Sequence, residues 1–193
     1  MADEQSKAAK RRFDDGNFHN RYFVGEGIDI GCGDDNLGYL SHVFRGIKSV
    51  RPWDMPDGDA QYLATIQDNQ FDVVTSAHCL EHMVDPHIAL QNWIRVCKPN
   101  GYLVITIPDE EMYEHDIWPS QYNTDHKWSF TLRNNSKMPK TTNVLDLCSR
   151  VNHLAVTEKI EVIRDFYYEN IPVQDQTRHP CIECCIEIIL KKL

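Results

Sequence analysis

The stretch GIDIGCGDD at residues 27–35 decides the fold. A short apolar run ends there in two glycines, Gly31 and Gly33, with one residue between them. Glycine has no Cβ, so it lets the backbone turn tightly and approach a ligand closely. In sheets of parallel strands, ligands bind beyond the carboxyl ends of the strands. The stretch therefore predicts a first buried strand followed by a ligand-binding turn.

Acidic residues surround this turn: Asp29 lies inside it, and Asp34 and Asp35 follow it. Negative charge repels the phosphate groups that glycine-rich turns hold in dinucleotide-binding proteins. The third glycine of that dinucleotide fingerprint is also missing, since residue 36 is asparagine. The turn therefore favours a cationic ligand that carries a ribose over a dinucleotide or a nucleoside triphosphate.

Apolar runs and helix-like patterns alternate along the rest of the chain. We expect strands at 25–31, 46–51, 71–78, 102–108, 155–170 and 181–193, and helical segments within the polar N-terminus and at 35–44, 61–66, 85–98 and 142–153. Asp85 and Pro86 are typical of a helix start. The alternation predicts one α/β domain over residues 1–193, with a doubly wound, mostly parallel sheet and an antiparallel pair formed by the last two strands.

Composition and charge argue against several classes of protein. The net charge of −9 disfavours a non-specific nucleic-acid binder. No apolar run approaches the roughly 20 residues that cross a bilayer, and MADEQSKAAKRR lacks the apolar centre of a secretory signal. The seven cysteines have no disulfide-framework spacing, which indicates reduced thiols. We therefore expect a cytoplasmic protein without a membrane segment; the sequence does not indicate its oligomeric state.

Candidate ribose and adenine ligands follow the second short strand. Asp54 lies about twenty residues after Gly33, where nucleoside-binding half-sheets place a carboxylate for the ribose hydroxyls. Asp59 and Ala60 offer a side-chain acceptor and a backbone amide for an adenine. Because Asp57 lies between them, the assignment of the ribose and adenine acids among Asp54, Asp57 and Asp59 stays open.

Three segments in this order resemble the class I S-adenosylmethionine-dependent methyltransferases of the type 11 family: GIDIGCG (27–33), GDA (58–60) and FDVVTSAHCLEHMVDPHIALQNWIRVCKPNGYLVITIP (71–108). The resemblance implies a Rossmann-like fold and S-adenosylmethionine as the cofactor. That family places a helix and a third strand where only four residues separate Asp54 from Asp59, so we expect a sheet trimmed after its second strand. The cofactor-binding residues that the resemblance implies are Asp29 near the ammonium group, Gly31, Cys32 and Gly33 at the methionyl part, Asp54 at the ribose, Asp59 and Ala60 at the adenine, and Ser76, Ala77 and His78 along the cofactor.

Histidines are the candidate general bases for such a reaction. A hydroxyl acceptor loses its proton near the transition state, and a histidine with a pKa near 6.5 accepts a proton at neutral pH. His126 is the first candidate, because it lies among aromatic residues in DHKWSF (125–130); His78 and His82 are the others. We expect residues 109–140 to face the substrate and residues 1–24 to form a lid or tail.

A divalent metal site is an alternative role for the same histidines. His78, Glu81 and His82 follow H-x-x-E-H spacing, which places three ligands on one side of a helical turn, and His126 would complete a set of four. The small-RNA 2′-O-methyltransferases look similar here, with two glutamates and a histidine in such a run. In this chain a histidine takes the place of the first glutamate.

The expected function is methyl transfer from S-adenosylmethionine to a small polar acceptor. Similarity to methyltransferases of bacterial surface-polysaccharide biosynthesis favours a hydroxyl of a sugar or polysaccharide precursor, with an amine as the second choice. Two alternatives remain: an RNA or nucleotide 2′-O-methyltransferase with a metal site, which the net charge disfavours, and a non-catalytic cofactor-binding module.

Overall fold

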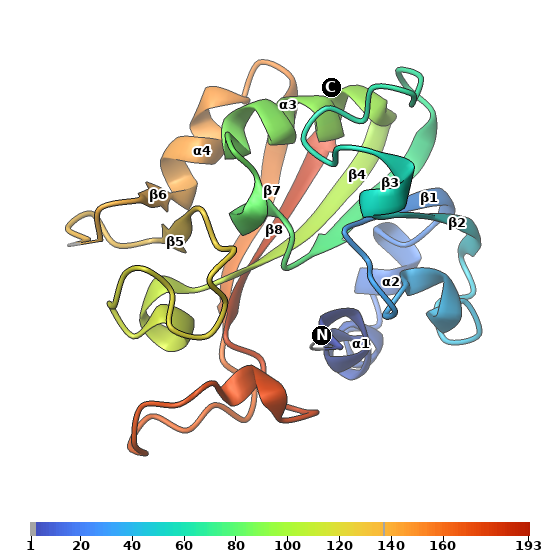
Figure 1. Ribbon diagram of the computed structural model, residues 1–193. Helices are drawn as coiled ribbons and strands as arrows, with labels where there is room; N and C mark the ends of the chain where they lie inside the picture. The colour runs from blue at the N-terminus through green and yellow to red at the C-terminus, as the bar shows by residue number, and fades with distance from the viewer. Residues whose placement is uncertain (1–2, 137) are drawn as a thin grey trace.

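Apolar strands form a six-stranded sheet in the computed structural model, which describes residues 3–136 and 138–193. The strands stand in the order β2-β1-β3-β4-β8-β7 (Figure 1). β1 to β4 are parallel, whereas β8 runs antiparallel between β4 and β7. The predicted α/β class with an antiparallel terminal pair is confirmed. The strand bounds are β1 Gly25–Ile30, β2 Ile47–Trp53, β3 Phe71–Ala77, β4 Cys97–Pro108, β7 Ala155–Ile163 and β8 Cys185–Lys192.

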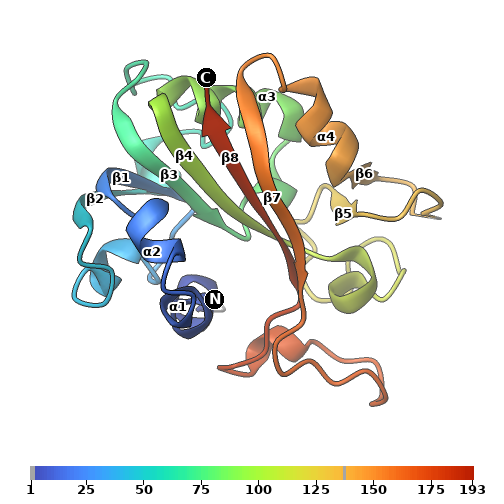
Figure 2. The same cartoon turned by 180° about the vertical axis from the view of Figure 1, so that it is seen from behind.

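Helices pack on both faces of this sheet. On one face, Trp93 of α3 and Leu147 of α4 join the larger hydrophobic core (Figure 1). On the other face, Phe18 of α2 packs in a second core with Val73 and Val104 of the sheet (Figure 2). None of the helices in the described part of the chain combines the length and apolarity that a membrane crossing needs. The helices are α1 Glu4–Asp14, α2 Phe18–Arg21, α3 Pro86–Val96 and α4 Val144–Arg150.

The sheet is trimmed after its second strand, as the sequence indicates. β2 is an edge strand, and residues 54–70 lead from it to β3. These residues, all described, hold one short 3₁₀ helix, η2 (Met55–Asp57), and otherwise turns. The helical turn expected at 61–66 is therefore wrong. Leu63 has a φ of 46°, a left-handed conformation that interrupts a right-handed helix.

Two expected strands are shorter than the sequence indicates. β7 ends at Ile163 rather than extending to 170, and Phe166 beyond it has a left-handed φ of 59°. β8 begins at Cys185 rather than at 181, because the backbone before it makes other bonds: the Ile182 N–H donates to the His179 carbonyl at 3.4 Å and the Glu183 N–H to the Asp165 carbonyl at 3.0 Å. Residues 164–184, between the two strands, form a long loop that extends away from the sheet (Figures 1 and 2).

Two other segments also differ from expectation. The helix expected at 35–44 is only a 3₁₀ turn, η1 (Leu37–Leu40), which starts where the Asn36 side chain accepts a hydrogen bond from the Gly38 N–H. The segment 109–140, where the sequence pattern indicated no helix or strand, holds a π-helix and a short strand. These elements are η4 Glu110–Glu114 and β5 Ser129–Thr131, which pairs with β6 Thr141–Asn143.

A buried charge cluster fastens α1 to the sheet. Arg12 Nε lies 3.0 Å from Glu187 Oε2, and both side chains are almost inaccessible to solvent. Arg11 also contacts Glu187, at 3.1 Å, and Glu183, at 2.9 Å. Burial raises the pKa of Glu187, but the Arg12 and Arg11 guanidinium groups outweigh burial and bring it to about 2.

This cluster makes stability sensitive to acid. Because the folded-state pKa of Glu187 lies below its ordinary value of 4.5, its stabilisation is complete above pH 4.5 and is lost as the pH falls toward 2. The shift corresponds to about 3 kcal/mol. In urea unfolding at stepped pH, the difference between wild type and Glu187→Gln should shrink over this interval. Glu161→Gln, at a half-exposed position, is the control. If the difference in the free energy of unfolding between wild type and Glu187→Gln stays constant from pH 4.5 to pH 2, the lowered pKa does not belong to Glu187.

Candidate functional site

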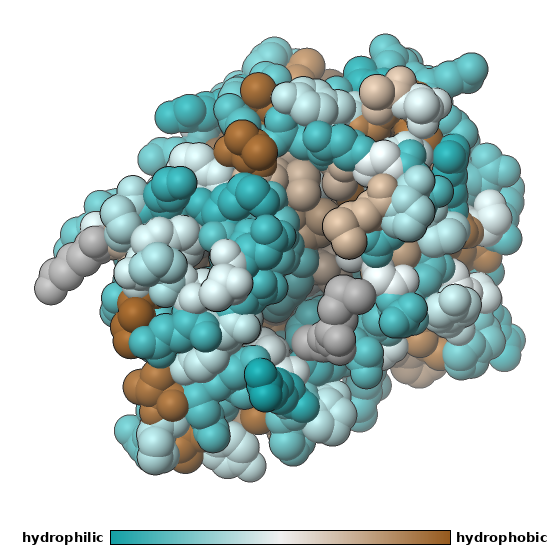
Figure 3. All heavy atoms as spheres, in the orientation of Figure 1, coloured by the Kyte–Doolittle hydropathy of each residue, from teal (hydrophilic) through white to brown (hydrophobic). Residues whose placement is uncertain are grey.

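The carboxyl ends of β1 and β3 open on a hollow of about 740 Å³, here called the central hollow. Figure 3 shows a depression near the centre of the molecule, with hydrophilic residues on one side and more apolar residues, coloured tan, on its floor and the other side. Five chain segments line the central hollow: 3–7 of α1, 31–35 of the glycine turn, 77–82 after β3, 113–126, and 175–180 before β8. The N-terminal segment and the 109–140 segment therefore both reach it.

The glycine turn connects β1 to the end of β2. Gly31 and Gly33 both have left-handed φ angles, 71° and 51°. The Gly31 N–H donates to the Trp53 carbonyl at 2.8 Å, and the Gly33 N–H donates to Asp54 Oδ2 at 2.7 Å. The structure thus brings together two predicted features, the glycine turn and the ribose carboxylate. Cys32 lies half-buried between the glycines and lines the central hollow.

Asp29 lies behind the turn rather than in the central hollow. It is fully buried, and its carboxylate accepts hydrogen bonds from the Leu37 N–H at 2.7 Å and from Gln5 Nε2 at 3.2 Å. Burial raises its pKa to about 7 despite these two bonds. Its carboxylate therefore stabilises the segment after the turn and holds α1 through Gln5. Its nearness to the ammonium group of a cofactor stays a prediction.

The remaining predicted cofactor residues divide between two places. Asp59 Oδ1 accepts from the Gln61 N–H at 2.8 Å, and the Ala60 carbonyl accepts from Trp93 Nε1 at 2.8 Å, both in the turns after β2. Ser76 is buried, and its hydroxyl donates to the Ile30 carbonyl at 2.9 Å, which joins β3 to β1. Ala77 and His78 line the central hollow.

His82 and His126 pack edge to face, with ring centroids 4.9 Å apart, beside a buried carboxylate. Glu81 Oε1 lies 3.9 Å from His82 Nε2 and 3.9 Å from His126 Nε2. The Nδ1 atom of each imidazole contacts a second carboxylate: Asp125 at 3.0 Å for His82 and Glu114 at 2.7 Å for His126. These five residues are called the imidazole–carboxylate cluster below.

His78 does not join this cluster. Its Nε2 atom lies 3.7 Å from Glu4 Oε2, on α1. Burial lowers the pKa of His78 to about 3, so its imidazole is neutral at neutral pH. The structure therefore brings together three of the four predicted metal ligands: Glu81, His82 and His126.

Three contributors to the site were not among the predicted residues. Glu114 belongs to the π-helix, which no sequence pattern indicated, and Asp125 directly precedes His126 in a segment expected to face the substrate. The third is the buried side of α1, where Gln5 bonds to Asp29 and to Thr75 Oγ1 at 2.9 Å. The polar sequence at the start of α1 carries no signal for these long-range contacts.

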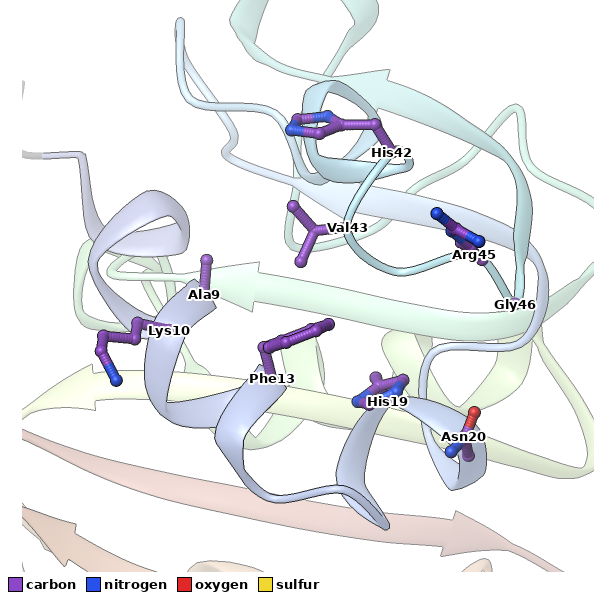
Figure 4. A pocket seen from close by; sticks show the side chains of 9 residues that line it. All are labelled: Ala9, Lys10, Phe13, His19, Asn20, His42, Val43, Arg45 and Gly46. Carbon is purple, nitrogen blue, oxygen red and sulfur yellow. The ribbon is translucent and has the colours of Figure 1, made fainter.

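A second hollow, of about 650 Å³, lies away from these groups. Figure 4 shows its side chains, which come from α1, α2 and the segment 42–46 before β2. It therefore lies at the amino end of β2, opposite the edge where parallel sheets bind ligands. Phe13 and His19 stack within it with ring centroids 5.4 Å apart, and no predicted site residue lines it.

Comparisons with known proteins agree with this architecture. A family model described as a methyltransferase domain matches residues 43–105, from before β2 into β4, and leaves the glycine turn outside its match. The curated demethylmenaquinone methyltransferase of Paenarthrobacter aurescens strain TC1 is 36% identical over 83 residues, which cover 43% of this chain and 31% of that protein. The chain thus matches less than a third of that relative's length.

Solved structures share the fold at low identity. A SAM-dependent methyltransferase from Archaeoglobus fulgidus superposes with a TM-score of 0.62 and 18% identity, over 100% of this chain and 95% of that one. The [4+2]-cyclase SpnF superposes with a TM-score of 0.56 and 17% identity, over 96% and 81%. Because a fold hosts more than one chemistry, these two likenesses establish architecture alone. Together, the match of a methyltransferase-domain model to residues 43–105 and the shared Rossmann-like fold make the chain similar to the class I S-adenosylmethionine-dependent methyltransferases.

Proposed function

We propose that the chain transfers the methyl group of S-adenosylmethionine to a hydroxyl of a small polar acceptor bound in the central hollow. One observation carries this proposal: the glycine turn and the imidazole–carboxylate cluster open into the same hollow. In the reaction, the acceptor oxygen forms a bond to the methyl carbon while the bond from that carbon to sulfur breaks. Holding the two reactants in line supplies much of the acceleration.

The cofactor side of the site is proposed to be the glycine turn and the end of β2. The turn presents backbone with no Cβ at Gly31 and Gly33, and Asp54 is fixed at its side by the Gly33 N–H. Asp34 and Asp35 add negative charge at the central hollow, which suits a sulfonium ligand. Asp59 and Ala60 remain the proposed adenine contacts.

The acceptor side is proposed to be the imidazole–carboxylate cluster. The carboxylates of Glu114 and Asp125 hold the Nδ1 atoms of the two imidazoles, so each Nε2 is directed to the interior. A neutral Nε2 of His126 or His82 accepts the proton that the acceptor hydroxyl loses. We give His78 no such role, because its nitrogen faces Glu4.

A sugar or polysaccharide-precursor hydroxyl is the acceptor that we favour. Tyr113, Tyr122 and Asn123 line the central hollow and offer hydrogen bonds to hydroxyl groups. The quinone-type acceptor named for the curated relative needs an apolar lining, whereas polar side chains predominate here. An RNA acceptor is disfavoured, because the acidic lining residues outnumber the basic ones and repel phosphate groups.

Calorimetry with S-adenosylmethionine tests the cofactor site. We expect wild type to bind, and Asp54→Ala to bind about tenfold to a hundredfold more weakly, since a charge-assisted hydrogen bond contributes about 1.5–3 kcal/mol. Asp146→Asn, at an exposed position in the first turn of α4, is the control and should bind as wild type does. Wild type that does not bind the cofactor would end the proposal. An unchanged affinity in Asp54→Ala would remove that residue from the site.

A transfer assay then tests the reaction and its acceptor. Protein and methyl-labelled S-adenosylmethionine are incubated with nucleotide sugars, with amine analogues of the same sugars and with short RNA. Label on a sugar hydroxyl is the expected result. Label on RNA would favour the nucleotide alternative, and binding without transfer to any acceptor would favour the non-catalytic one.

A further inference from the structure

We propose that Glu81, His82 and His126 form a binding site for one divalent transition-metal ion on the acceptor side of the central hollow. The three side chains come from two segments, 81–82 after β3 and 126 in the long segment after β4, and all three line the hollow. The site stands on its own geometry, and it rests on the proposed function only for the ion's part in methyl transfer.

The spacing of the three ligand atoms suits such an ion. One carboxylate oxygen and two imidazole nitrogens lie within 4.8 Å of one another, and Glu81 Oε1 is 3.9 Å from each Nε2. Ligands at about 2.1 Å from a shared ion lie roughly 3–4 Å apart. The same 3.9 Å exceeds hydrogen-bond length, so the imidazoles do not satisfy Glu81 directly.

Glu81 is the observation that points most strongly to a cation. Its side chain is fully buried, and neither carboxylate oxygen has a hydrogen-bond partner in the described part of the chain. Its backbone is fixed, because the N–H groups of Lys127 and Trp128 both donate to the Glu81 carbonyl. A buried carboxylate without partners is unfavourable unless it is neutralised or coordinates a metal. The carboxylate lies beside the two imidazoles, with Oε1 at 3.9 Å from each Nε2.

The groups behind the two histidines match those of metal ligands. Histidines that bind metals usually donate their other ring N–H to a carboxylate or a carbonyl, which sets the tautomer and orients the ring. Here both do so: His126 Nδ1 is 2.7 Å from Glu114 and His82 Nδ1 is 3.0 Å from Asp125. Both Nε2 atoms are thereby left with a lone pair for an ion.

The ligand set indicates the kind of ion and its place in the reaction. Two imidazoles and one carboxylate suit Mn²⁺, Co²⁺, Fe²⁺ or Zn²⁺, and three protein ligands leave open positions for a small molecule. Because the ligands line the central hollow, an acceptor oxygen can take an open position there. With the ion bound, His82 and His126 serve as its ligands rather than as bases. The ion would instead lower the pKa of the acceptor hydroxyl, whose proton would pass to solvent water.

Metal binding is measured on the full chain, made metal-free with a chelator and then dialysed. Titration with Mn²⁺ or Co²⁺ in a calorimeter avoids the thiol preference of Zn²⁺, which matters in a chain with seven cysteines. We expect one site per chain and a melting temperature that rises with ion concentration. Glu81→Gln and His126→Gln should weaken binding more than tenfold, and Asp125→Asn by about tenfold to a hundredfold.

Matched controls and a second variant keep the result decisive. His153→Gln and Glu26→Gln change exposed residues of the same types and should bind the ion as wild type does. His82→Gln, at a partly exposed position, replaces the buried variants if circular dichroism shows that they misfold. The absence of a stoichiometric site in wild type, or a site that none of the ligand variants weakens, would overturn the proposal.

Cofactor affinity measured on the same samples separates this proposal from the proposed function. Protein that binds the ion but not S-adenosylmethionine would support the metal site and refute the proposed function. Protein that binds the cofactor but has no ion site would refute the metal site and leave the proposed function supported.

Discussion

Replacing Glu187 by alanine should destabilise the protein by about 3–5 kcal/mol, because it leaves a buried charge without its partner. Glu187 is fully buried in β8, and Arg12, which it holds at 3.0 Å, has a side chain only 1% exposed. Arg11 at 3.1 Å and Lys159 at 3.2 Å add their charges to the same carboxylate. Removing the carboxylate therefore leaves three positive groups close together with little solvent around them.

The effect should extend from stability to the cofactor site. α1 carries Arg12 at one end, and near its other end Gln5 bonds to Asp29 behind the glycine turn. Gln5 Oε1 in turn accepts a hydrogen bond from Arg12 at 2.8 Å, so the two contacts are directly connected. We therefore expect Glu187→Ala to weaken S-adenosylmethionine binding although Glu187 does not line the central hollow.

Urea unfolding and calorimetry on the same preparations measure both effects. Glu161→Ala removes an exposed carboxylate that also contacts Lys159, and it should change stability by less than about 1 kcal/mol. If Glu187→Ala unfolds with the same free energy as Glu161→Ala, the charge cluster does not hold α1. If Glu187→Ala destabilises the protein but leaves the cofactor affinity unchanged, the contact of α1 with the glycine turn does not affect cofactor binding.

The sheet was predictable from sequence because its signals are local. The glycine turn after β1, the apolar runs of β3 and β4, and Asp85 before α3 each lie within one short window. Asp85 caps α3 as expected, with bonds to the His87 and Ile88 N–H groups at 2.9 and 3.2 Å. Two of the expectations that were wrong, the helical turn at 61–66 and the end of β7, concern single residues with left-handed φ angles, Leu63 and Phe166. Composition and periodicity do not reveal a left-handed conformation at a non-glycine residue.

The acceptor side could be predicted only in part, because contacts far apart in sequence assemble it. Spacing indicated Glu81 and His82, and the aromatic surroundings indicated His126. Spacing also suggested His78, but its backbone has a left-handed φ of 53° and its imidazole faces Glu4 of α1 instead. Glu114 joins the cluster only because η4 places it beside His126, twelve residues away. A pattern within one segment contains no information about such a pairing.

Replacing Gly31 by alanine should destabilise the fold by about 2–5 kcal/mol, whatever it does to cofactor binding. The backbone of Gly31 has a φ of 71°, which costs about 1–2 kcal/mol for a residue with a Cβ. A Cβ there would also meet the Cys79 side chain, with the two Cβ atoms 2.6 Å apart and Sγ closer still. Position 31 must therefore be glycine for the turn to pack against the segment after β3.

A double-mutant cycle with Cys79→Gly isolates the steric part of this effect. Cys79→Gly removes both atoms that the new Cβ would meet. Gly31→Ala should therefore lower the free energy of unfolding by about 1–3 kcal/mol less in the Cys79→Gly background than in wild type. Gly16→Ala, with nothing within 4 Å of the new Cβ, is the control. Additive effects in urea unfolding would refute the steric explanation. Because Gly31 variants change folding, a loss of S-adenosylmethionine binding in them reports on the cofactor contact only when affinity is measured under conditions where the variant is folded.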